Sequence, residues 1–490
     1  MNYQINVRDF GARADGITDD APAIQQALDF LAPTGGELRI PSGTYRMKSG
    51  VRVPVGVNVI GDTPATTGPW QNFLDSQDKG HPIEPRLGAV RENWLDPTHY
   101  RGTWILCDHG AGEENSGATF ELSGNTGVFK MGFVNVLEPP ITDTFVKCPP
   151  CIALTADKDR PYTREGVTVE DVSLANCCYG IVLQCGKELE NDYPGQRAWV
   201  SCGRHRIHNI MGGPIYRGIL LKGLLDTVDV TNVQFNYSCY DGVYVRTRAA
   251  ICIDFQLMRG DGILFSDCLS FGALIAFRTL PAYGGTCSLR LINSNFESAI
   301  PLCLHASGVC EVNNCYFLTV EPCNVKADSE YRCIEVLQDP TVPHEPFYAF
   351  TNCVMQCAEY GTRKDGTEKE GGHLLVRLTG NAHFLFNNCQ VWGCDGKTPI
   401  IRFEQEGETP SSLNINHTMF ISGGVVTKPS QMTGVLASVG GKGYRAGDLC
   451  FSGCRIPSGM YNGTDTTGMW FDRCIITDDT ENRCLDTMGN

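Results

Sequence analysis

The chain has 490 residues, of which 42% are hydrophobic and 19% charged, enough for several ordinary domains or one long solenoid. Its formal net charge of -15 argues against nucleic acid as a general partner. No window has the apolar length that a transmembrane helix needs, and Met1 to Gln4 lack the basic and apolar regions of a secretory signal, so we expect a cytoplasmic protein without a membrane partner.

The first 31 residues predict a strand, a turn and a helix. Residues 5–10 suit a short strand, and Asp15-Gly16 is a common turn dipeptide. We expect a helix from Ala21 to Leu31, capped by Thr18 or Asp19, with acidic residues in its first turn. The acidic residues of this segment are therefore interpreted as turn and cap groups and not as catalytic groups.

The segment after the helix returns as a strand. Gly35-Gly36 ends the helix, residues 37–40 suit a strand, and Pro41-Ser42-Gly43 suits a tight turn. The whole order over residues 7–45, V-x-D-F-G-A-x-x-D-G-x-T-D-D…A-I-x-x-A-L…G-G…P-x-G-x-Y, resembles the opening of pectate-lyase-superfamily proteins, a group that includes polygalacturonase-like glycoside hydrolases. The resemblance implies an all-β fold: a single-stranded right-handed parallel β-helix with a short N-terminal α-helical cap. It also implies carbohydrate binding on the long parallel face, usually with cleavage of glycosidic bonds.

The rest of the chain repeats a β-rich segment, a turn and another β-rich segment. The clearest examples are residues 166–184, 204–223, 226–246, 261–278 and 287–306. Their uneven spacing favours a solenoid with loops of different length over a propeller. We expect one continuous domain: cap and first coils in 1–61, an inserted loop in 62–102, and β-helix in 103–490. Residues 186–199 and 359–372 also break the rhythm and are predicted loops.

The 24 cysteines do not require a disulfide scaffold, because so long a chain can bury a large core. Many follow an Asn or Asp in a β-rich segment, and we interpret these as core-filling thiols. The Asn residues are expected to stack at one corner of successive coils, where Asn tolerates a left-handed backbone. Examples of these pairs are Asn176-Cys177, Asp267-Cys268, Asn314-Cys315, Asn352-Cys353 and Asn388-Cys389. Cys148 and Cys151 have redox or metal spacing, but no second pair at zinc-site spacing accompanies them.

Turn glycines align several strands and predict an outer face. Gly180, Gly218, Gly242 and Gly272 open similar strands, which places Ile181, Ile219 and Val243 inside. The outer face then carries six substrate-binding candidates: Arg217, Lys222, Tyr244, Arg246, Arg248 and Arg278. Lys222 and Arg246 would be neighbours, which is unfavourable unless an anion binds them or Asp226, Asp241 or Asp254 pairs with them. The two alternatives are a carboxylate subsite and a structural ion pair.

Hydrolysis of a glycosidic bond needs two carboxyl groups, one as acid and one as base or nucleophile. Asp241 would lie beside Arg217, and the following coils carry three further candidates. The catalytic candidates are Asp241, Asp261, Asp267 and Glu297, with Asp241 and Asp261 preferred. The polygalacturonase pattern of paired aspartates followed by Gly-His-Gly and Arg-x-Lys is not found. The leading hypothesis is nevertheless a glycoside hydrolase acting on a polysaccharide or oligosaccharide, uronate-containing polymers included.

Two alternatives stay open. A polysaccharide lyase would use Lys222, Tyr244, Arg246 or Arg248 on a uronate, and it would be metal-independent because no acidic run resembles a calcium site. The other alternative is a glycan-binding β-helix like a phage tailspike, without catalysis. His205, His208 and His305 are spare acid or base candidates, more simply explained as hydrogen-bonding residues. We expect no cofactor and no metal, and the resemblance makes a homotrimer one expected assembly.

Overall fold

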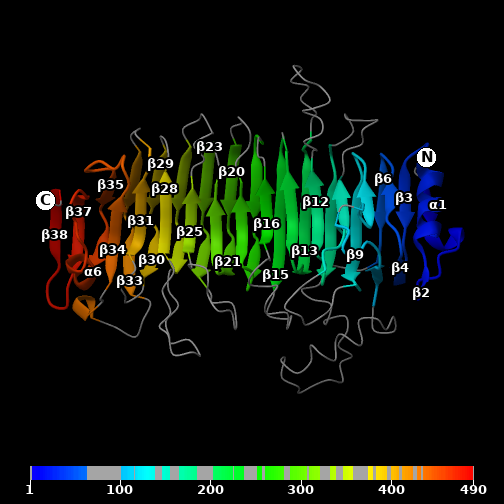
Figure 1. The fold of residues 1–490 in the computed structure, drawn as a ribbon, viewed down its shortest axis with the longest axis horizontal. Coiled ribbons are helices and arrows are strands. Elements are labelled where there is room, and N and C mark those ends of the chain that lie inside the picture. Colours follow the sequence, from blue (N-terminus) through cyan, green and yellow to red (C-terminus); the bar gives the residue numbers. More distant parts are fainter. Residues whose placement is uncertain are drawn as a thin grey trace, which may run out of the picture. The chain divides into compact units, whose positions relative to one another are not determined.

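The structure is a computed structural model. It describes residues 3–62, 101–114, 116–137, 146–154, 165–184, 202–224, 226–236, 251–256, 260–280, 287–305, 308–319, 332–337, 346–356, 373–378, 382–393, 399–407, 411–422, 428–431 and 434–488. Two compact units divide the chain, Met1–Ile263 with Cys268–Ala273 and Leu264–Asp267 with Leu274–Asn490. Both units are built from short parallel strands, and the fold is a right-handed parallel β-helix, as the sequence predicted (Figure 1).

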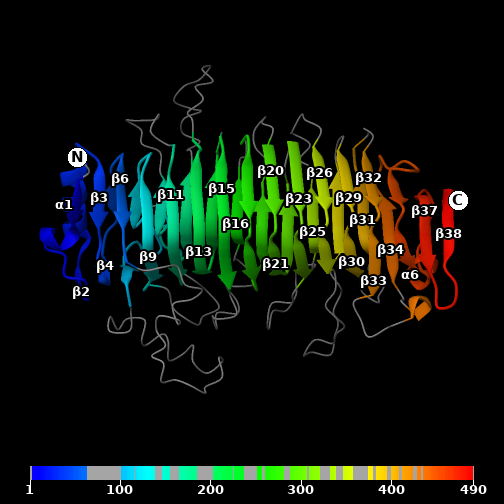
Figure 2. The same ribbon diagram turned by 180° about the vertical axis from the view of Figure 1, so that it is seen from behind.

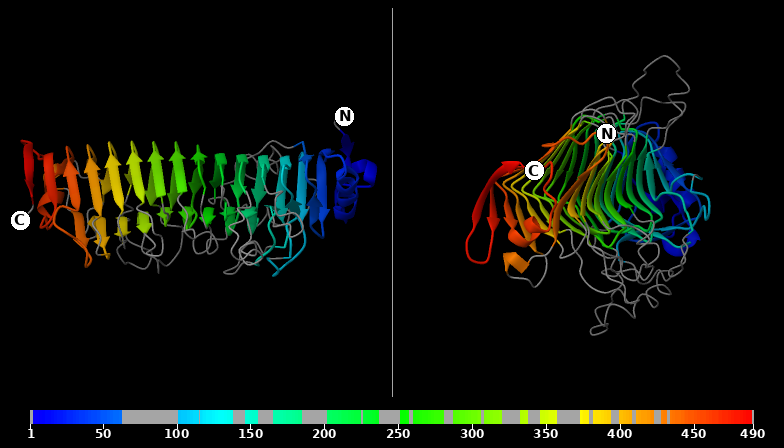
Figure 3. Two further views of the ribbon diagram at one scale, coloured as in Figure 1. Left: turned by 90° about the horizontal axis from the view of Figure 1, so that it is seen from above. Right: turned by 60° about the vertical axis from the view of Figure 1, so that its left-hand side comes forward.

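The N-terminal cap contains the predicted helix. It consists of β1 (Gln4–Asn6), the 3-10 helix η1 (Val7–Phe10), β2 (Asp15–Asp19), α1 (Ala21–Leu31), β3 (Gly36–Arg39) and β4 (Gly43–Met47). Helix α1 has the predicted bounds and buries one apolar face, including Ile24, Leu28 and Leu31. It lies at the blue end of the first unit, where it covers the first coils (Figure 3). The expected strand over residues 5–10 is only partly extended, since its second half is η1.

The acidic residues of the cap serve backbone geometry, although not quite as expected. Asp20 is the N-cap residue of α1, and no acidic residue lies in the first turn. The Asp20 carboxylate instead accepts hydrogen bonds from the backbone N–H groups of Arg13 and Ala14, at 2.7 and 3.1 Å. Asp15 accepts from the backbone N–H of Thr18 at 2.7 Å and of Ile17 at 2.9 Å. These bonds hold the pKa of Asp15 down at about 2, whereas burial raises the pKa of Asp20.

The first unit contains two sets of parallel strands. One set is a short sheet that we call sheet B1, in the spatial order β5, β8, β10, β12, β14, β16. Its strands are β5 (Val51–Val53), β8 (Phe120–Leu122), β10 (Ile152–Leu154), β12 (Tyr179–Gln184), β14 (Arg217–Lys222) and β16 (Ile251–Gln256). The other strands are β6 (Val57–Ile60), β7 (Thr103–Cys107), β9 (Gly127–Asn135), β11 (Thr168–Ala175), β13 (His205–Gly213), β15 (Val228–Asn236) and β18 (Leu269–Phe271). Strand β17 (Ile263–Ser266) falls at the boundary of the units.

The second unit has the same organisation. Its short sheet, sheet B2, has the order β19 (Ile275–Thr279), β22 (Ile300–Leu304), β25 (Arg332–Leu337), β28 (His373–Leu378), β31 (Pro399–Gln405) and β34 (Val435–Gly440). The other strands are β20 (Cys287–Ile292), β21 (Asn295–Ser298), β23 (Gly308–Asn313), β24 (Tyr316–Thr319), β26 (Phe347–Thr351), β27 (Val354–Gln356), β29 (His383–Asn387), β30 (Gln390–Gly393), β32 (Ser412–Asn416), β33 (Met419–Ser422), β35 (Leu449–Ser452) and β36 (Arg455–Pro457). The unit ends with η3 (Pro429–Gln431), α6 (Ser458–Asn462), β37 (Trp470–Thr477) and β38 (Arg483–Met488), and β37 and β38 pair antiparallel.

Aromatic rings fill the coils of the second unit. Phe350 stacks on Phe386 and Tyr348 on Phe384, each with ring centroids 4.6 Å apart. The strands that carry them, β26 and β29, are neighbours in register. Figure 2 shows the same order from behind. In a parallel solenoid each coil repeats the inward positions of the coil before it, so side chains at equivalent positions stack on one another.

The Asn-Cys pairs lie at a corner of the coils, as predicted. Asn314, Asn352 and Asn388 have φ of 54°, 55° and 52°, in the left-handed region. Asn388 donates to the Oδ1 of Asn352 at 2.8 Å, so the amides bond from coil to coil. The thiols that follow point inward: Cys353 Sγ lies 3.6 Å from the Val312 carbonyl oxygen. Among the described residues 18 cysteines are free thiols, and 16 of these are buried, which confirms the core-filling interpretation.

Several predictions fall on residues outside the described ranges. They include most of the predicted insertion over 62–102 and the whole of 186–199 and 359–372. Among the described residues no helix is long and apolar enough to cross a membrane.

Candidate functional site

The outer face of sheet B1 carries the register that the turn glycines predicted. Strands β12 and β14 pair in parallel with Ile181 opposite Ile219 and Gln184 opposite Lys222. Both isoleucines are fully buried, so the inward assignment is correct. Tyr179 lies opposite Arg217 at the start of the two strands.

The next strand is not the one that the sequence suggested. Strand β14 pairs with β16, which places Arg217 opposite Ile251 and Lys222 opposite Gln256. Residues 251–255 are all buried, and they take the place beside β14 that the sequence assigned to the segment beginning at Gly242. Asp241, Tyr244, Arg246 and Arg248 lie outside the described residues, and their expected roles stay predictions.

Arg217 forms a buried ion pair across the two strands. Its Nε donates to the Oδ2 of Asp254 at 3.0 Å, and the Asp254 side chain is completely buried. Gln256 Nε2 donates to the same oxygen at 2.8 Å. One Arg217 terminal nitrogen donates to the Tyr216 carbonyl at 2.9 Å, which helps to fix the guanidinium. Asp254 was a predicted partner for Lys222 or Arg246, and its partner in the structure is Arg217.

Two tyrosines extend this pair into a larger group. The Arg217 guanidinium carbon lies 3.9 Å from the ring centroid of Tyr216, and the Tyr179 ring meets Tyr216 edge-on at 5.2 Å. The Tyr179 hydroxyl donates to Glu114 Oε2 at 2.7 Å. Lys147 Nζ lies 3.1 Å from the Glu114 carboxylate and 5.5 Å from the Tyr216 centroid. We call Glu114, Lys147, Tyr179, Tyr216, Arg217 and Asp254 the tyrosine cluster.

The charges of the cluster are fixed by its hydrogen bonds. The bond from Tyr179 holds the pKa of Glu114 below its usual value, with burial opposing and Lys147 adding to the effect. The bond to Glu114 raises the pKa of Lys147. Burial, reinforced by the bond to Glu114, raises the pKa of Tyr179 far above its usual range. At neutral pH Glu114 is therefore a carboxylate, Lys147 is a cation and Tyr179 is a neutral phenol.

The side chains of the tyrosine cluster are of the kinds that sugar-binding surfaces use. Aromatic rings offer faces to the C–H groups of a pyranose or furanose ring, and Arg and Lys side chains bind carboxylate or sulfate groups. An ionised carboxylate with 29% of its side chain exposed, as in Glu114, is able to accept a proton from water or a hydroxyl group.

The other sequence-predicted residues lie elsewhere. Asp261 is an exposed turn residue before β17, and it makes no described hydrogen bond to the tyrosine cluster. Asp267 and Glu297 belong to the second unit, where Asp267 has the left-handed φ of 55° seen at the Asn corner positions. Glu297 lies on β21 and accepts a hydrogen bond from Asn295 at 3.4 Å. Arg278 lies on β19 of sheet B2, in register with Cys303.

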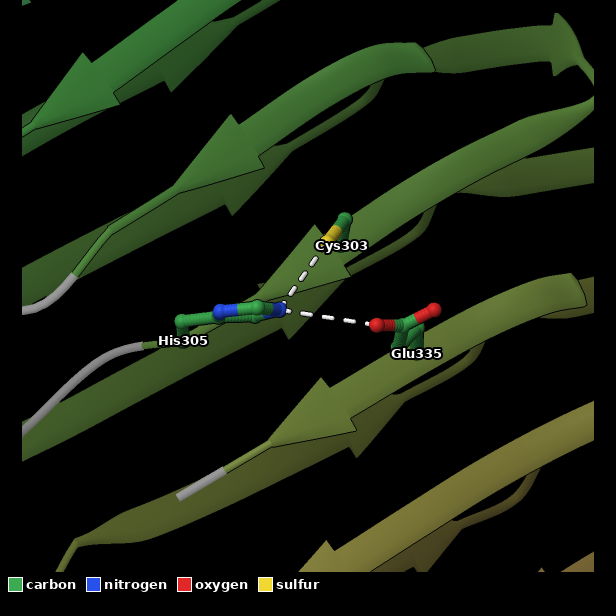
Figure 4. A group of neighbouring side chains, drawn as sticks. All are labelled: Cys303, His305 and Glu335. Atoms are coloured by element: carbon green, nitrogen blue, oxygen red, sulfur yellow. Dashed lines mark hydrogen bonds and ion pairs between the residues drawn. The ribbon is translucent and has the colours of Figure 1, made fainter. Parts of the chain in front are cut away.

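Sheet B2 holds a second polar group, formed by Cys303, His305, Arg332 and Glu335. Figure 4 shows Cys303, His305 and Glu335 converging from β22 and β25. The His305 Nε2 atom lies 3.3 Å from Cys303 Sγ and 3.5 Å from Glu335 Oε1, and Arg332 bonds to the other oxygen of Glu335. Burial opposes ionisation of Glu335, but the bonds from His305 and Arg332 outweigh it and lower its pKa.

Sequence reasoning missed most of both groups. Tyr179 is the first residue of β12 and Tyr216 immediately precedes β14, and this position at the start of a strand was available as a signal. Glu114 and Lys147 lie outside strands, so no periodicity points to them.

Of the three spare histidines, His305 has a thiol and a carboxylate beside it, whereas His208 is exposed beside Glu170. Cys151 lies 3.9 Å from Cys107 and forms no disulfide with Cys148.

Residues 4–76 match the family described as rhamnogalacturonase A/epimerase, pectate lyase-like. Alginate lyase 7 of Azotobacter vinelandii is 46% identical over 61 residues, 12% of this chain and 7% of that protein. Iota-carrageenase of Alteromonas macleodii is 42% identical over 67 residues, 12% of this chain and 13% of that protein. The matches thus span less than a seventh of these curated relatives.

One solved structure resembles the chain over most of its length. It is the DFA-IIIase of Arthrobacter chlorophenolicus A6 without its lid, with a TM-score of 0.52, 12% identity, and coverage of 85% of this chain and 94% of that chain. At this identity the likeness concerns the fold. The chain is a right-handed parallel β-helix protein whose residues 4–76 resemble the pectate-lyase-like family.

Proposed function

We propose that the chain is a carbohydrate-active enzyme that hydrolyses glycosidic bonds of an acidic polysaccharide on the outer face of sheet B1. The observation that carries the proposal is the tyrosine cluster: two aromatic rings, two cations and two carboxylates joined on one face of three neighbouring strands and the loops beside them. Fold alone does not fix the reaction, and the argument therefore rests on these side chains.

The cations favour an anionic substrate. The Lys147 side chain is 45% exposed, and Arg217 is held by Asp254 and Tyr216 in one orientation. A fixed guanidinium loses little freedom when it binds a planar carboxylate, which favours a uronate or a similar acidic sugar. The names of the two curated relatives point to alginate and iota-carrageenan, both anionic polysaccharides, and this supports the same class of substrate.

Glu114 is the proposed base. Its hydrogen bonds from Tyr179 and Lys147 keep it ionised, as a base that activates water must be. The acid must be a second carboxyl group that keeps its proton, roughly 5–9.5 Å away depending on the stereochemical course. Asp254 is engaged by two donors, so Asp241 remains the proposed acid, as the sequence suggested.

A lyase is the second candidate, and one observation favours it. Two cations lie near the Tyr216 ring: the Arg217 guanidinium carbon at 3.9 Å and the Lys147 ammonium nitrogen at 5.5 Å from its centroid. In β-elimination a phenolate or an uncharged amine takes the proton α to a uronate carboxylate while a nearby cation stabilises the charge that develops there. Tyr216 with its two cations offers both parts of that chemistry.

The experiment is incubation of the full chain with a panel of acidic and neutral polysaccharides, followed by two measurements on the products. Hydrolysis on acidic substrates gives new reducing ends without ultraviolet absorbance from an unsaturated uronide. Equal amounts of reducing ends and unsaturated product contradict hydrolysis and support the lyase. Binding without any product contradicts both and leaves a non-catalytic glycan-binding protein.

A further inference from the structure

Three potential metal ligands converge on the outer face of sheet B2. Cys303 lies on β22 and His305 directly follows its last residue, so the two side chains, two residues apart, leave the same face. Glu335 lies directly opposite Cys303 in the register of β22 and β25. The Cys303 Sγ, His305 Nε2 and Glu335 Oε1 atoms all lie within 4.8 Å of one another (Figure 4).

The contacts of His305 do not suit a nucleophile relay. In such a relay the thiol meets one ring nitrogen of the histidine and the carboxylate meets the other. Here Cys303 and Glu335 both approach Nε2, at 3.3 and 3.5 Å. A single nitrogen carries at most one proton and does not serve both partners well, whereas one metal ion is able to bind all three atoms at once.

We propose that Cys303, His305 and Glu335 form a zinc site with three protein ligands and an open fourth position. Zinc in a tetrahedral site takes thiolate, imidazole and carboxylate ligands at about 2.3, 2.0 and 2.1 Å, which places neighbouring ligand atoms about 3.5 Å apart. The observed separations of 3.3 and 3.5 Å already have that spacing. A thiolate and a carboxylate also neutralise the charge of a divalent ion.

Neighbouring groups hold two of the ligands in position. Arg332 binds the second oxygen of Glu335 and leaves Oε1 directed at His305. A bulge between Arg332 and Ile334 lets residues 332 and 335 share one face, which a regular strand does not allow. The backbone N–H of His305 donates to the buried Thr279 Oγ1 at 3.0 Å. A hydrogen bond to the second oxygen of a ligating carboxylate, as Arg332 makes to Glu335, is typical of metal sites.

The exposed fractions of the three ligand side chains indicate where the open fourth coordination position of the metal would lie. Cys303 and the Glu335 side chain are 5% and 7% exposed, whereas the His305 side chain is 25% exposed. Three protein ligands with one free position are the arrangement of zinc sites that bind water or a substrate oxygen. Arg278 lies in register beside Cys303, so an anionic oxygen is the expected fourth ligand.

The test uses the full chain, freed of metal with a chelator and titrated with Zn²⁺ or with Co²⁺ as a coloured probe. We expect one equivalent to bind and Co²⁺ to give a thiolate-to-metal absorption band. The Cys303→Ser and Glu335→Gln variants should bind at least tenfold more weakly, and Cys303→Ser should lose the band. Cys484→Ser, which removes an exposed thiol, is the control and should behave as wild type. Arg332→Ala should weaken binding about tenfold through Glu335.

X-ray absorption of the zinc-loaded wild type tests the site without any variant. The proposal requires one sulfur at about 2.3 Å and nitrogen or oxygen neighbours at about 2.0 Å. Two or more sulfur neighbours would place the metal among other thiols, such as Cys107 and Cys151, and would overturn the assignment. Unchanged affinity in Cys303→Ser, or no binding by the wild type, would overturn it as well. These outcomes are independent of the glycan products that test the proposed function.

Discussion

The Arg217 guanidinium and the Asp254 carboxylate meet at 3.0 Å between β14 and β16, and Asp254 has no exposed surface. Burying two charges is costly, and it is offset here by the ion pair, by Gln256 and by the Tyr216 ring. The pair therefore holds Arg217 as a fixed cation at the edge of the tyrosine cluster. Because the same pair joins β14 to β16, a change that breaks it affects both the stability of this coil and the proposed site.

The Asp254→Ala variant should be destabilised by about 3–5 kcal/mol, because it leaves Arg217 partly buried without its carboxylate. Chemical denaturation followed by circular dichroism measures the change. The exposed pair of Arg290 and Glu311 is the control, and Glu311→Ala should cost less than about 1 kcal/mol. A double variant with Arg217→Met and Asp254→Leu should be more stable than Asp254→Ala. Equal losses for the buried and the exposed pair would contradict this interpretation.

Substitutions of Asn352 separate backbone geometry from hydrogen bonding. Asn352 has a φ of 55° and accepts from Asn388 at 2.8 Å. Asn352→Ala loses the side-chain bonds to Asn388 and Asn313 and leaves alanine in a left-handed conformation, whereas Asn352→Gly loses only these bonds. We expect the alanine variant to be about 1–2 kcal/mol less stable than the glycine variant. Thermal unfolding of both proteins decides this, and an alanine variant as stable as the glycine variant would disprove it.

His205 should make the protein less stable in mild acid. Burial lowers its pKa from 6.5 to about 4, and the backbone N–H of Val167 donates to its Nδ1 at 3.2 Å. The unfolded chain therefore binds a proton that the folded chain refuses. The contribution is fully present above pH 6.5 and is lost as the pH falls toward 4, on the order of 3 kcal/mol in total.

The variant His205→Gln should flatten this pH dependence of the unfolding free energy, measured between pH 7 and about pH 4. His208→Gln changes an exposed histidine and should leave the profile as in wild type. A His205→Gln profile parallel to that of the wild type would assign the pH dependence to other groups.

Sequence patterns predicted the elements whose geometry is local. Helix α1 was predicted at Ala21–Leu31 because its apolar spacing and flanking turns are local signals. The pairing of Ile181 with Ile219 followed from equivalent glycines at the starts of two strands with the same alternation. The corner role of Asn352 followed in the same way, from a short motif repeated in several coils.

Pairing over variable loops could not be predicted from local patterns. The choice of β16 over the segment at Gly242 depends on which of two β-rich stretches the coil buries, and residues 251–255 are buried throughout. Glu335 reaches His305 because β25 pairs with β22 after a long connection, and a bulge in β25 brings Arg332 to the same face. Neither the length of a connection nor a bulge leaves a periodic signal in the sequence.

The most direct test of the proposed function is the rate at which the Glu114→Gln variant releases reducing ends from the best substrate of the wild type. Glutamine keeps the size of the side chain but removes the charge, so kcat/KM should fall about 10²–10⁴-fold. Glu113→Gln alters the adjacent exposed carboxylate and should retain wild-type activity. Matching circular dichroism spectra would show that both variants fold. A Glu114→Gln protein with wild-type activity would contradict the central claim that the tyrosine cluster is the catalytic centre.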